Sequence, residues 1–255
     1  MTLTYVYCVV ASARPPGLDR APRGLVGAGR VRLLDVARDL VAVVASVPST
    51  RYGEAVINNK LSDLRWVSRA ALAHEAVVEH FARAHAVLPM KLFTIFGDDE
   101  RAGAHLRGEA QRLRAVARKV AGHHEWGVRV LLAPSVRPVA TTEENGASGS
   151  SRSGAAYLTA KKVRRDASLE RSSRARTTTS SLYTRLAKRA RASRRRGSDG
   201  IAGASGLLLD AAFLVPRSRG AAFRALAMRE ARALAPQGYA VAVTGPWPPY
   251  TFVQD

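Results

Sequence analysis

A long, strongly basic and weakly apolar segment in the second half of the chain most constrains the possible fold. Between Ser150 and Gly200 the sequence holds 15 Lys and Arg against three acidic residues, a local charge of +12 within a whole-chain charge of +20. Residues 155–174 and 182–196 are predicted to be helical, and the five poor helix formers Thr177–Ser181 are expected to interrupt them. The apolar face of this segment is thin, so the helix is predicted to project into solvent.

The remaining sequence has enough apolar residues for two folded domains. The chain has 255 residues, of which 47% are hydrophobic, and this length suits two compact domains. The one cysteine, Cys8, excludes an intrachain disulfide and a Cys-rich metal site and favours a reducing compartment. The apolar run Tyr5–Ala11 is too short for a membrane span or a secretory signal. We therefore expect a soluble, cytoplasmic protein.

Residues 1–122 are predicted to form an N-terminal α+β domain. Pro89 indicates an edge strand or an interrupted strand. Ser62 and Asp63 allow a break in the helical stretch over residues 54–83. Gly122 is a natural stop for the helix that precedes it. The expected elements are a buried strand at 4–10, a hairpin of strands at 31–36 and 39–47, one or two helices over 54–83, strand residues over 87–96 and a helix over 98–121.

Residues 123–255 are predicted to form a second α+β domain. They contain a strand, a long helix, a strand, a helix and a strand, close to a ferredoxin-like order with one strand missing, which we expect near Ile201–Ala204. Residues 134–154 are rich in Ser, Thr and Gly and are predicted to be a flexible insertion. The extended helical segment covers residues 155–196. The predicted fold class is therefore α+β, with two α+β domains, the second carrying a long, basic, projecting helix.

Patterns that suggest catalysis or metal binding fail on spacing. His74 and His80 are six residues apart, about 600° around a helix, so they point to different faces and the stretch is interpreted as an exposed polar face. His123–Glu125 is interpreted as a turn with solvated imidazoles. The glycine-rich stretch Gly24–Gly29 has the Rossmann spacing reversed. We predict no enzyme activity, no catalytic residue, no cofactor and no metal site.

The basic segment has three interpretations: a solvated helix, a docking surface for an acidic protein, or a contact for nucleic acid or anionic membrane. Phosphate binding would be steeply dependent on salt. RNA-binding modules interleave aromatic and basic residues, and this segment offers only Tyr157 and Tyr183, which weakens the nucleic-acid interpretation. The candidate partner-binding residues are Lys161, Lys162, Arg164, Arg165, Arg185, Lys188 and Arg189.

The C-terminal stretch Gly245–Phe252 is the most distinctive string of the chain. Its three prolines fix the backbone angle φ and favour an extended conformation. Two interpretations remain open: a rigid tail whose aromatic side chains Tyr250 and Phe252 pack over the chain's own sheet, or a ligand presented to the groove of a partner.

Several short motifs stand out by their order and spacing along the chain. The motifs are Tyr5-Val6-Tyr7, Asp63–Trp66 ahead of Ala73–Glu75, Val87–Phe96, His124–Val130, Ala155–Leu158, Ala212–Val215 and Gly245–Tyr250. Together they resemble the GvpL/GvpF family of gas vesicle accessory proteins. The sequence departs from the family pattern at Leu92-Phe93, where the family usually carries Phe-Gly. The motif residues interpreted as structural are Trp66, Glu75, Pro89, Trp126, Tyr157, Gly245, Pro246, Trp247, Pro248, Pro249 and Tyr250.

The resemblance implies a non-enzymatic role in gas vesicle formation. It implies a fold of two α+β domains, the second of which is a modified ferredoxin fold. It also implies that the protein is an assembly factor or minor vesicle component that engages the hydrophobic shell protein and other accessory proteins. Our hypothesis is that such a protein limits aggregation by covering apolar shell surface until nucleation. Candidate contact surfaces are the exposed face of the helix over 54–83 and the basic helix around 161–196. The alternative function is a basic nucleic-acid-binding protein that uses residues 155–196.

Overall fold

The structure is a computed structural model that describes residues 1–82, 86–132, 154–197 and 206–253. It divides into a first unit of residues 1–126, 214–218 and 245–255, and a second unit of residues 127–213 and 219–244. Helices and strands are mixed, and they form two antiparallel sheets. This confirms the α+β fold class. The predicted insertion at 134–154 lies outside the described residues, except for Gly154.

The first unit is built on a five-stranded sheet with the order β2-β3-β1-β4, in which β5 also pairs with β1. The predicted first strand and the following hairpin are confirmed, and the strand at 87–96 is interrupted, as Pro89 indicates. The elements are β1 (Thr2–Ala11), β2 (Arg32–Ala37), β3 (Leu40–Pro48), α1 (Ser49–Tyr52), α2 (Glu54–Lys60), α3 (Leu64–Ala82), β4 (Ala86–Pro89), β5 (Ile95–Phe96), α4 (Asp99–Gly108), α5 (Ala110–Val120) and α8 (Tyr250–Val253).

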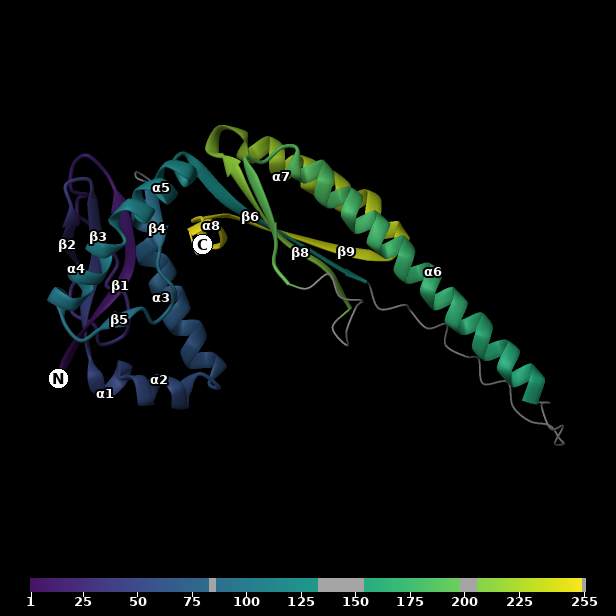
Figure 1. The fold of residues 1–255 in the computed structure, drawn as a ribbon, viewed down its shortest axis with the longest axis horizontal. Helices are drawn as coiled ribbons and strands as arrows, with labels where there is room; N and C mark the ends of the chain where they lie inside the picture. The colour runs from purple at the N-terminus through teal and green to yellow at the C-terminus, as the bar shows by residue number, and fades with distance from the viewer. Residues whose placement is uncertain (83–85, 133–153, 198–205, 254–255) are drawn as a thin grey trace. The chain divides into compact units, whose positions relative to one another are not determined.

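Helices cover both faces of this sheet (Figure 1). Successive side chains of a strand point to opposite faces, and two neighbours in β1 show which helix lies on each. Thr4 Oγ1 donates a hydrogen bond to Asp99 Oδ1 of α4 at 2.6 Å. The Tyr5 hydroxyl lies 2.7 Å from Nδ1 of His74 in α3 and is hydrogen-bonded to it. Because β1 is covered on both faces, its residues from Thr4 to Val10 are all buried, as an apolar, β-branched strand requires.

Aspartate side chains set the start of two helices in the first unit. Asp63 Oδ1 accepts hydrogen bonds from the backbone N–H groups of Arg65 and Trp66 at 3.0 and 3.1 Å. Asp98 Oδ1 accepts one from the N–H of Arg101 at 2.8 Å. Such bonds satisfy the free N–H groups of a first helical turn. The helical stretch over 54–83 is therefore two helices, α2 and α3, separated at the break that Ser62 and Asp63 allow.

The second sheet has four strands in the order β7-β8-β6-β9. The strand expected near Ile201–Ala204 falls outside the described residues. Residues Ala192–Arg195, which were predicted to be helical, form a strand of this sheet. The ferredoxin-like designation stays a prediction. The elements are β6 (His123–Leu132), α6 (Gly154–Ala187), β7 (Ala192–Arg195), β8 (Leu207–Pro216), α7 (Gly220–Leu234) and β9 (Tyr239–Trp247), with 3₁₀ turns at Arg217–Arg219 and Ala235–Gln237.

Helices α6 and α7 lie on the same face of this sheet (Figure 1). Phe213 of β8 contacts both helices: its ring centroid is 5.5 Å from that of Phe223 in α7 and 5.6 Å from that of Tyr183 in α6. Leu182 and Leu186 of α6 are completely buried. These side chains form an apolar layer between the sheet and the two helices.

Helix α6 is continuous from Gly154 to Ala187, so the predicted interruption at Thr177–Ser181 is wrong. Thr177 and Thr179 donate their hydroxyl hydrogen bonds to the carbonyls of Ser173 and Ala175, one turn back. In this way the threonines stay within the helix instead of ending it. The helix ends before residue 196, because Ala192–Arg195 is strand β7.

The outer part of α6 is exposed, as predicted. From Thr159 to Arg171 every described side chain is exposed, and Ala175 is the first buried one. Among the described residues, no helix is both long and apolar enough to cross a bilayer.

Candidate protein-binding surfaces

The described part of the chain holds no group of three or more His, Cys, Asp or Glu side chains placed to bind a metal ion. The interpretation of residues 74–80 as an exposed polar face is wrong for His74, which is only 3% exposed. Burial lowers the pKa of His74 to about 4, and the backbone of Met90 acts in the opposite direction. At neutral pH the imidazole is therefore uncharged and serves as a core hydrogen-bonding group.

Tyrosine rings pack against this buried histidine. The ring centroids of Tyr5 and Tyr7 lie 5.7 and 5.6 Å from that of His74. The Tyr7 hydroxyl accepts a hydrogen bond from the N–H of Leu25 at 3.0 Å, and burial raises the pKa of Tyr7 to about 12. Gly24 has φ of +74°, and a Cβ at this position would lie 2.1 Å from the Tyr7 hydroxyl oxygen. The glycine-rich loop is thus shaped by close packing against Tyr7.

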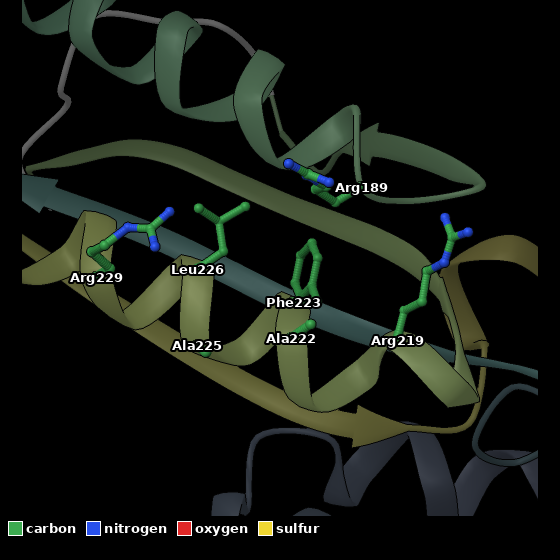
Figure 2. Close-up of a pocket in the computed structure, with 7 residues that line it drawn as sticks. All are labelled: Arg189, Arg219, Ala222, Phe223, Ala225, Leu226 and Arg229. Carbon is green, nitrogen blue, oxygen red and sulfur yellow. The ribbon is translucent and has the colours of Figure 1, made fainter.

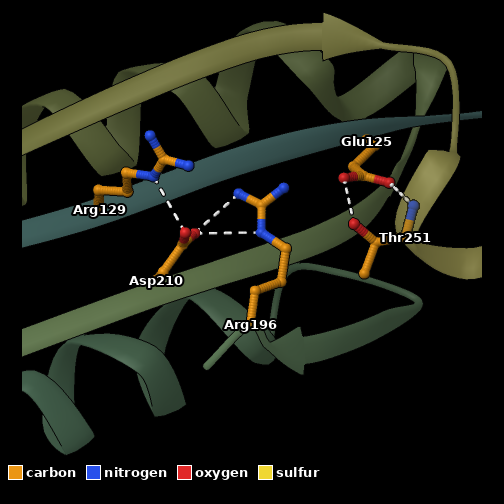
Figure 3. Close-up of polar contacts among 5 residues, drawn as sticks. All are labelled: Glu125, Arg129, Arg196, Asp210 and Thr251. Atoms are coloured by element: carbon orange, nitrogen blue, oxygen red, sulfur yellow. Dashed lines mark hydrogen bonds and ion pairs between the residues drawn. The ribbon is translucent and has the colours of Figure 1, made fainter. Parts of the chain in front are cut away.

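The C-terminal motif is held by two glutamates of the first unit. Tyr250 donates a hydrogen bond to Glu75 Oε2 at 2.5 Å. The two oxygens of Glu125 accept hydrogen bonds from the hydroxyl and the backbone N–H of Thr251 at 2.6 and 2.7 Å (Figure 3). Glu125 is 3% exposed, so it does not belong to a solvated turn; His123 begins strand β6.

The other motif residues of this region are packed around the same contacts. A Cβ on Gly245, which has φ of +118°, would lie 2.8 Å from the Glu125 carbonyl oxygen, so the backbone there leaves room only for glycine. Trp126, Pro89, Pro248 and Pro249 are buried, as are Phe252 and Val253 in α8, whereas Pro246 and Trp247 are exposed. Tyr250 and Phe252 therefore pack within their own unit, whereas Trp247 does not.

Trp66 is the other aromatic motif residue that the structure describes. Its ring stacks on Phe93, with centroids 5.0 Å apart and an interplanar angle of 16°. Phe93 has φ of +65°, a left-handed conformation that favours glycine. The resemblance described above leads us to expect glycine at this position. The side chain of Tyr157 lies outside the described set.

The candidate cations of α6 and the turn after it are in different surroundings. Lys161, Lys162 and Arg165 are exposed on the outer part of the helix, and the side chain of Arg164 is not among the described ones. Arg185 forms a two-pronged ion pair with Glu230 of α7, with N–O distances of 3.1 and 2.9 Å. Arg185 thus joins α6 to α7.

The open face of the second sheet pairs its charges internally. Asp210 of β8 accepts hydrogen bonds from Nε of Arg129 at 3.0 Å and from Nε of Arg196 at 3.1 Å (Figure 3). The carboxylate side chain is 12% exposed, so it is largely covered by the two guanidinium groups. Both guanidinium groups are therefore used in contacts within the second unit.

Arg189 lines a groove of about 610 Å³ along α7, which sequence reasoning missed. Phe223 and Leu226 project from α7 into the groove, Arg219 and Arg229 flank them along the helix, and Arg189 faces them from the segment that follows α6 (Figure 2). Ala222 and Ala225 complete the lining. Lys188 is exposed next to Arg189 and is not part of the lining. Residues 222, 225, 226 and 229 have the spacing of one helix face. This spacing is the feature of the sequence that could have indicated the groove.

A second candidate surface is an exposed leucine stripe on the first unit, formed by Leu61, Leu64 and Leu72. These side chains are 51%, 76% and 72% exposed. Arg65, Ser68 and Arg69 lie beside Leu64 around a shallow depression of about 500 Å³. Leu61 lies in the turn between α2 and α3, and Leu64 and Leu72 belong to α3. Leu72 points away from the buried face that carries His74, and Leu64 lies in the first turn of the helix.

These features define an α+β protein that presents charged and apolar surfaces. The family model "Gas vesicle synthesis protein GvpL/GvpF" matches residues 3–254. Gas vesicle protein L of Streptomyces sp. (strain CB03234) is 33% identical over 98% of this chain and 92% of its own length. The chain belongs to the GvpL/GvpF family, whose members have an accessory role in gas vesicle formation.

Solved structures of the family share the fold. The crystal structure of GvpF from Anabaena sp. PCC7120 matches 100% of this chain and 97% of its own, with a TM-score of 0.71 and 16% identity. That of GvpF from Microcystis aeruginosa matches 99% of both chains, with a TM-score of 0.63 and 15% identity.

Proposed function

We propose that this protein is a non-enzymatic assembly factor or minor component of gas vesicles that binds the hydrophobic shell protein and limits its aggregation during nucleation. Membership of the GvpL/GvpF family supports the gas vesicle role. The exposed leucine stripe carries the proposal for shell binding, because soluble proteins rarely expose several large apolar side chains together without a partner. The place of action is the cytoplasmic surface of the vesicle, and other accessory proteins are further partners.

The chemistry of the stripe fits an apolar partner. Leu64 and Leu72 are eight residues apart in α3, which is about two turns with an offset of about 80° around the helix. Each leucine removed from water contributes about 1.5–3 kcal/mol. Shell subunits that form a gas-facing wall expose apolar surface before assembly. Covering part of that surface with a folded, highly charged protein would keep single subunits dispersed.

A pull-down between this protein and the shell subunit tests the proposal. We expect capture that persists at high salt, because apolar contacts are little screened. The double variant Leu64→Asp/Leu72→Asp should lose most of the capture, whereas Leu169→Asp, at an exposed leucine of α6, should retain it. No capture at either salt concentration, or equal loss in both variants, would overturn the proposal.

The exposed cations Lys161, Lys162 and Arg165 favour one alternative, nucleic-acid binding by the basic segment. Phosphate contacts release counterions, so such binding weakens steeply with salt. A filter-binding titration with mixed DNA and RNA separates the two functions. Submicromolar, salt-steep binding that is lost when all three cations are replaced by Glu would favour the nucleic-acid function.

A further inference from the structure

We infer that the groove along α7 is a docking site for an acidic amphipathic helix of a partner protein. This inference rests on the proposed role of the protein as a binder of other gas vesicle proteins, but it uses a different unit and a different surface from the leucine stripe. Its basis is the combination of an apolar floor with three arginines that form no ion pair with a carboxylate among the residues that the structure describes.

The floor has the pattern of a helix-binding surface. Ala222, Ala225 and Leu226 lie on one face of α7, and Phe223 points into the same groove (Figure 2). An amphipathic helix that docks in such a groove contacts it through apolar residues spaced at i, i+3, i+4 and i+7. Small alanine side chains allow the backbone of a second helix to approach closely.

The rim determines the charge of the occupant. Within the described part of the chain, none of Arg189, Arg219 and Arg229 forms an ion pair with a carboxylate, and none of the groove-lining residues is acidic. An apolar partner would cover three guanidinium groups without replacing the hydrogen bonds that they form with water. Such burial of unpaired charge costs binding free energy. A partner with carboxylates placed opposite them would instead form charge-assisted hydrogen bonds.

The spacing of the arginines sets the length of the occupant. Arg219 lies in the 3₁₀ turn immediately before α7, and Arg229 lies in the middle of α7. They are ten residues apart, which corresponds to about 15 Å along a helix. A docked helix that meets both needs two acidic residues about ten positions apart, on the flank of an apolar face of about three turns. Arg189, across the groove, would meet a third carboxylate between them.

Fluorescence anisotropy with a labelled synthetic peptide tests this inference on the full-length protein. The peptide has about 15 residues, leucines on one helical face and glutamates about ten residues apart; a second peptide has glutamine in place of each glutamate. We expect the acidic peptide to bind at least about tenfold more tightly than the neutral one, with affinity that falls as salt rises.

Charge-reversal variants locate the binding. Arg219→Glu and Arg229→Glu should each weaken binding of the acidic peptide about tenfold or more. Arg224→Glu and Arg232→Glu, at exposed arginines of the same helix that do not line the groove, should leave it within about twofold. Circular dichroism of all four variants is the control that checks whether each one is folded.

Three outcomes would overturn the inference: no binding of the acidic peptide to the wild-type protein, equal weakening by the groove variants and the control variants, or tighter binding of single-stranded RNA in place of the peptide. The shell-protein pull-down is independent of these results. If the acidic peptide does not bind but the shell protein is captured, only the inference about the groove is rejected. If the peptide binds but the shell protein is not captured, only the proposed shell binding is rejected.

Discussion

The Tyr250 hydroxyl donates a 2.5 Å hydrogen bond to Glu75 Oε2, which joins the last helix of the chain to α3 across 175 positions of sequence. Burial raises the pKa of the Glu75 carboxyl, and the Tyr250 bond opposes that rise. Burial raises the pKa of Tyr250, and the hydrogen bond to Glu75 raises it further. The bond therefore gives the C-terminal motif a structural role and makes the first unit sensitive to the charge of one buried carboxyl.

Replacing this carboxyl should change how stability depends on pH. A group whose folded pKa is raised keeps its proton longer in the folded than in the unfolded state, so stability is lost as pH rises through the folded pKa. We expect wild-type protein to lose free energy of unfolding relative to Glu75→Gln as pH rises above 4.5, the ordinary pKa of a glutamate. Urea denaturation across that range measures the difference, with Glu54→Gln, at an exposed position, as control. A constant difference between wild type and Glu75→Gln would contradict this assignment.

His74 should act on the acid side in the opposite sense. Its pKa is lowered from 6.5 to about 4 by burial, so its contribution is complete above pH 6.5 and is lost as pH falls toward 4, by about 3 kcal/mol in total. We expect His74→Gln to flatten this part of the stability profile, although the variant is less stable at pH 7. The exposed His105→Gln is the control and should follow the wild type. A wild-type slope retained in His74→Gln would refute the prediction.

Phe93 combines a favourable stack with an unfavourable backbone. The stack on Trp66 contributes about 0.5–1.5 kcal/mol, and a left-handed conformation costs a non-glycine residue about 1–2 kcal/mol. Phe93→Ala should lose the stack and keep the backbone cost, whereas Phe93→Gly loses both. We therefore expect Phe93→Gly to be more stable than Phe93→Ala by about 1 kcal/mol in thermal or urea unfolding. Equal stability of the two variants would show that the backbone at this position is unstrained.

The two ends of α6 should respond differently to the same substitution. Leu186 is fully buried and Leu169 is 60% exposed. Leu186→Ala should destabilise the second unit by about 2–5 kcal/mol, because it leaves a cavity. Leu169→Ala should change stability by no more than about 0.5 kcal/mol. Chemical denaturation followed by circular dichroism measures both, and a large effect at Leu169 would mean that the outer part of the helix is packed.

Much of the first unit could be predicted from local sequence. The apolar strand at 4–10, the hairpin and the helix start at Asp98 each depend on residues close together in the chain. The error at Thr177–Ser181 has a physical reason: helix propensity counts β-branched residues as unfavourable, but here Leu182 and Leu186 are buried in the apolar layer of the second unit. Tertiary packing outweighs a local preference of a few tenths of a kcal/mol per residue.

The buried polar contacts could not be predicted from local sequence. His74 appears as an ordinary polar residue on a helix until Tyr5, 69 positions away, is placed beside it. Glu125 likewise finds its partner in Thr251, 126 positions later. Arg189, which lines the groove on α7, comes from the segment after α6. Only the lining residues that belong to α7 follow one helical spacing in the sequence. The charge count identified the basic segment but could not separate paired cations, such as Arg185, from exposed ones, such as Lys161.

The exposed outer half of α6 has a consequence for how this protein can vary. Because the described side chains from Thr159 to Arg171 are exposed, adding or deleting whole turns there would leave the buried leucines and the strand hydrogen bonds unchanged. The length and charge of the outer part of α6 can therefore change in evolution without changing the packed core of the second unit. A fluorophore attached there would report on binding of a partner without disturbing that core.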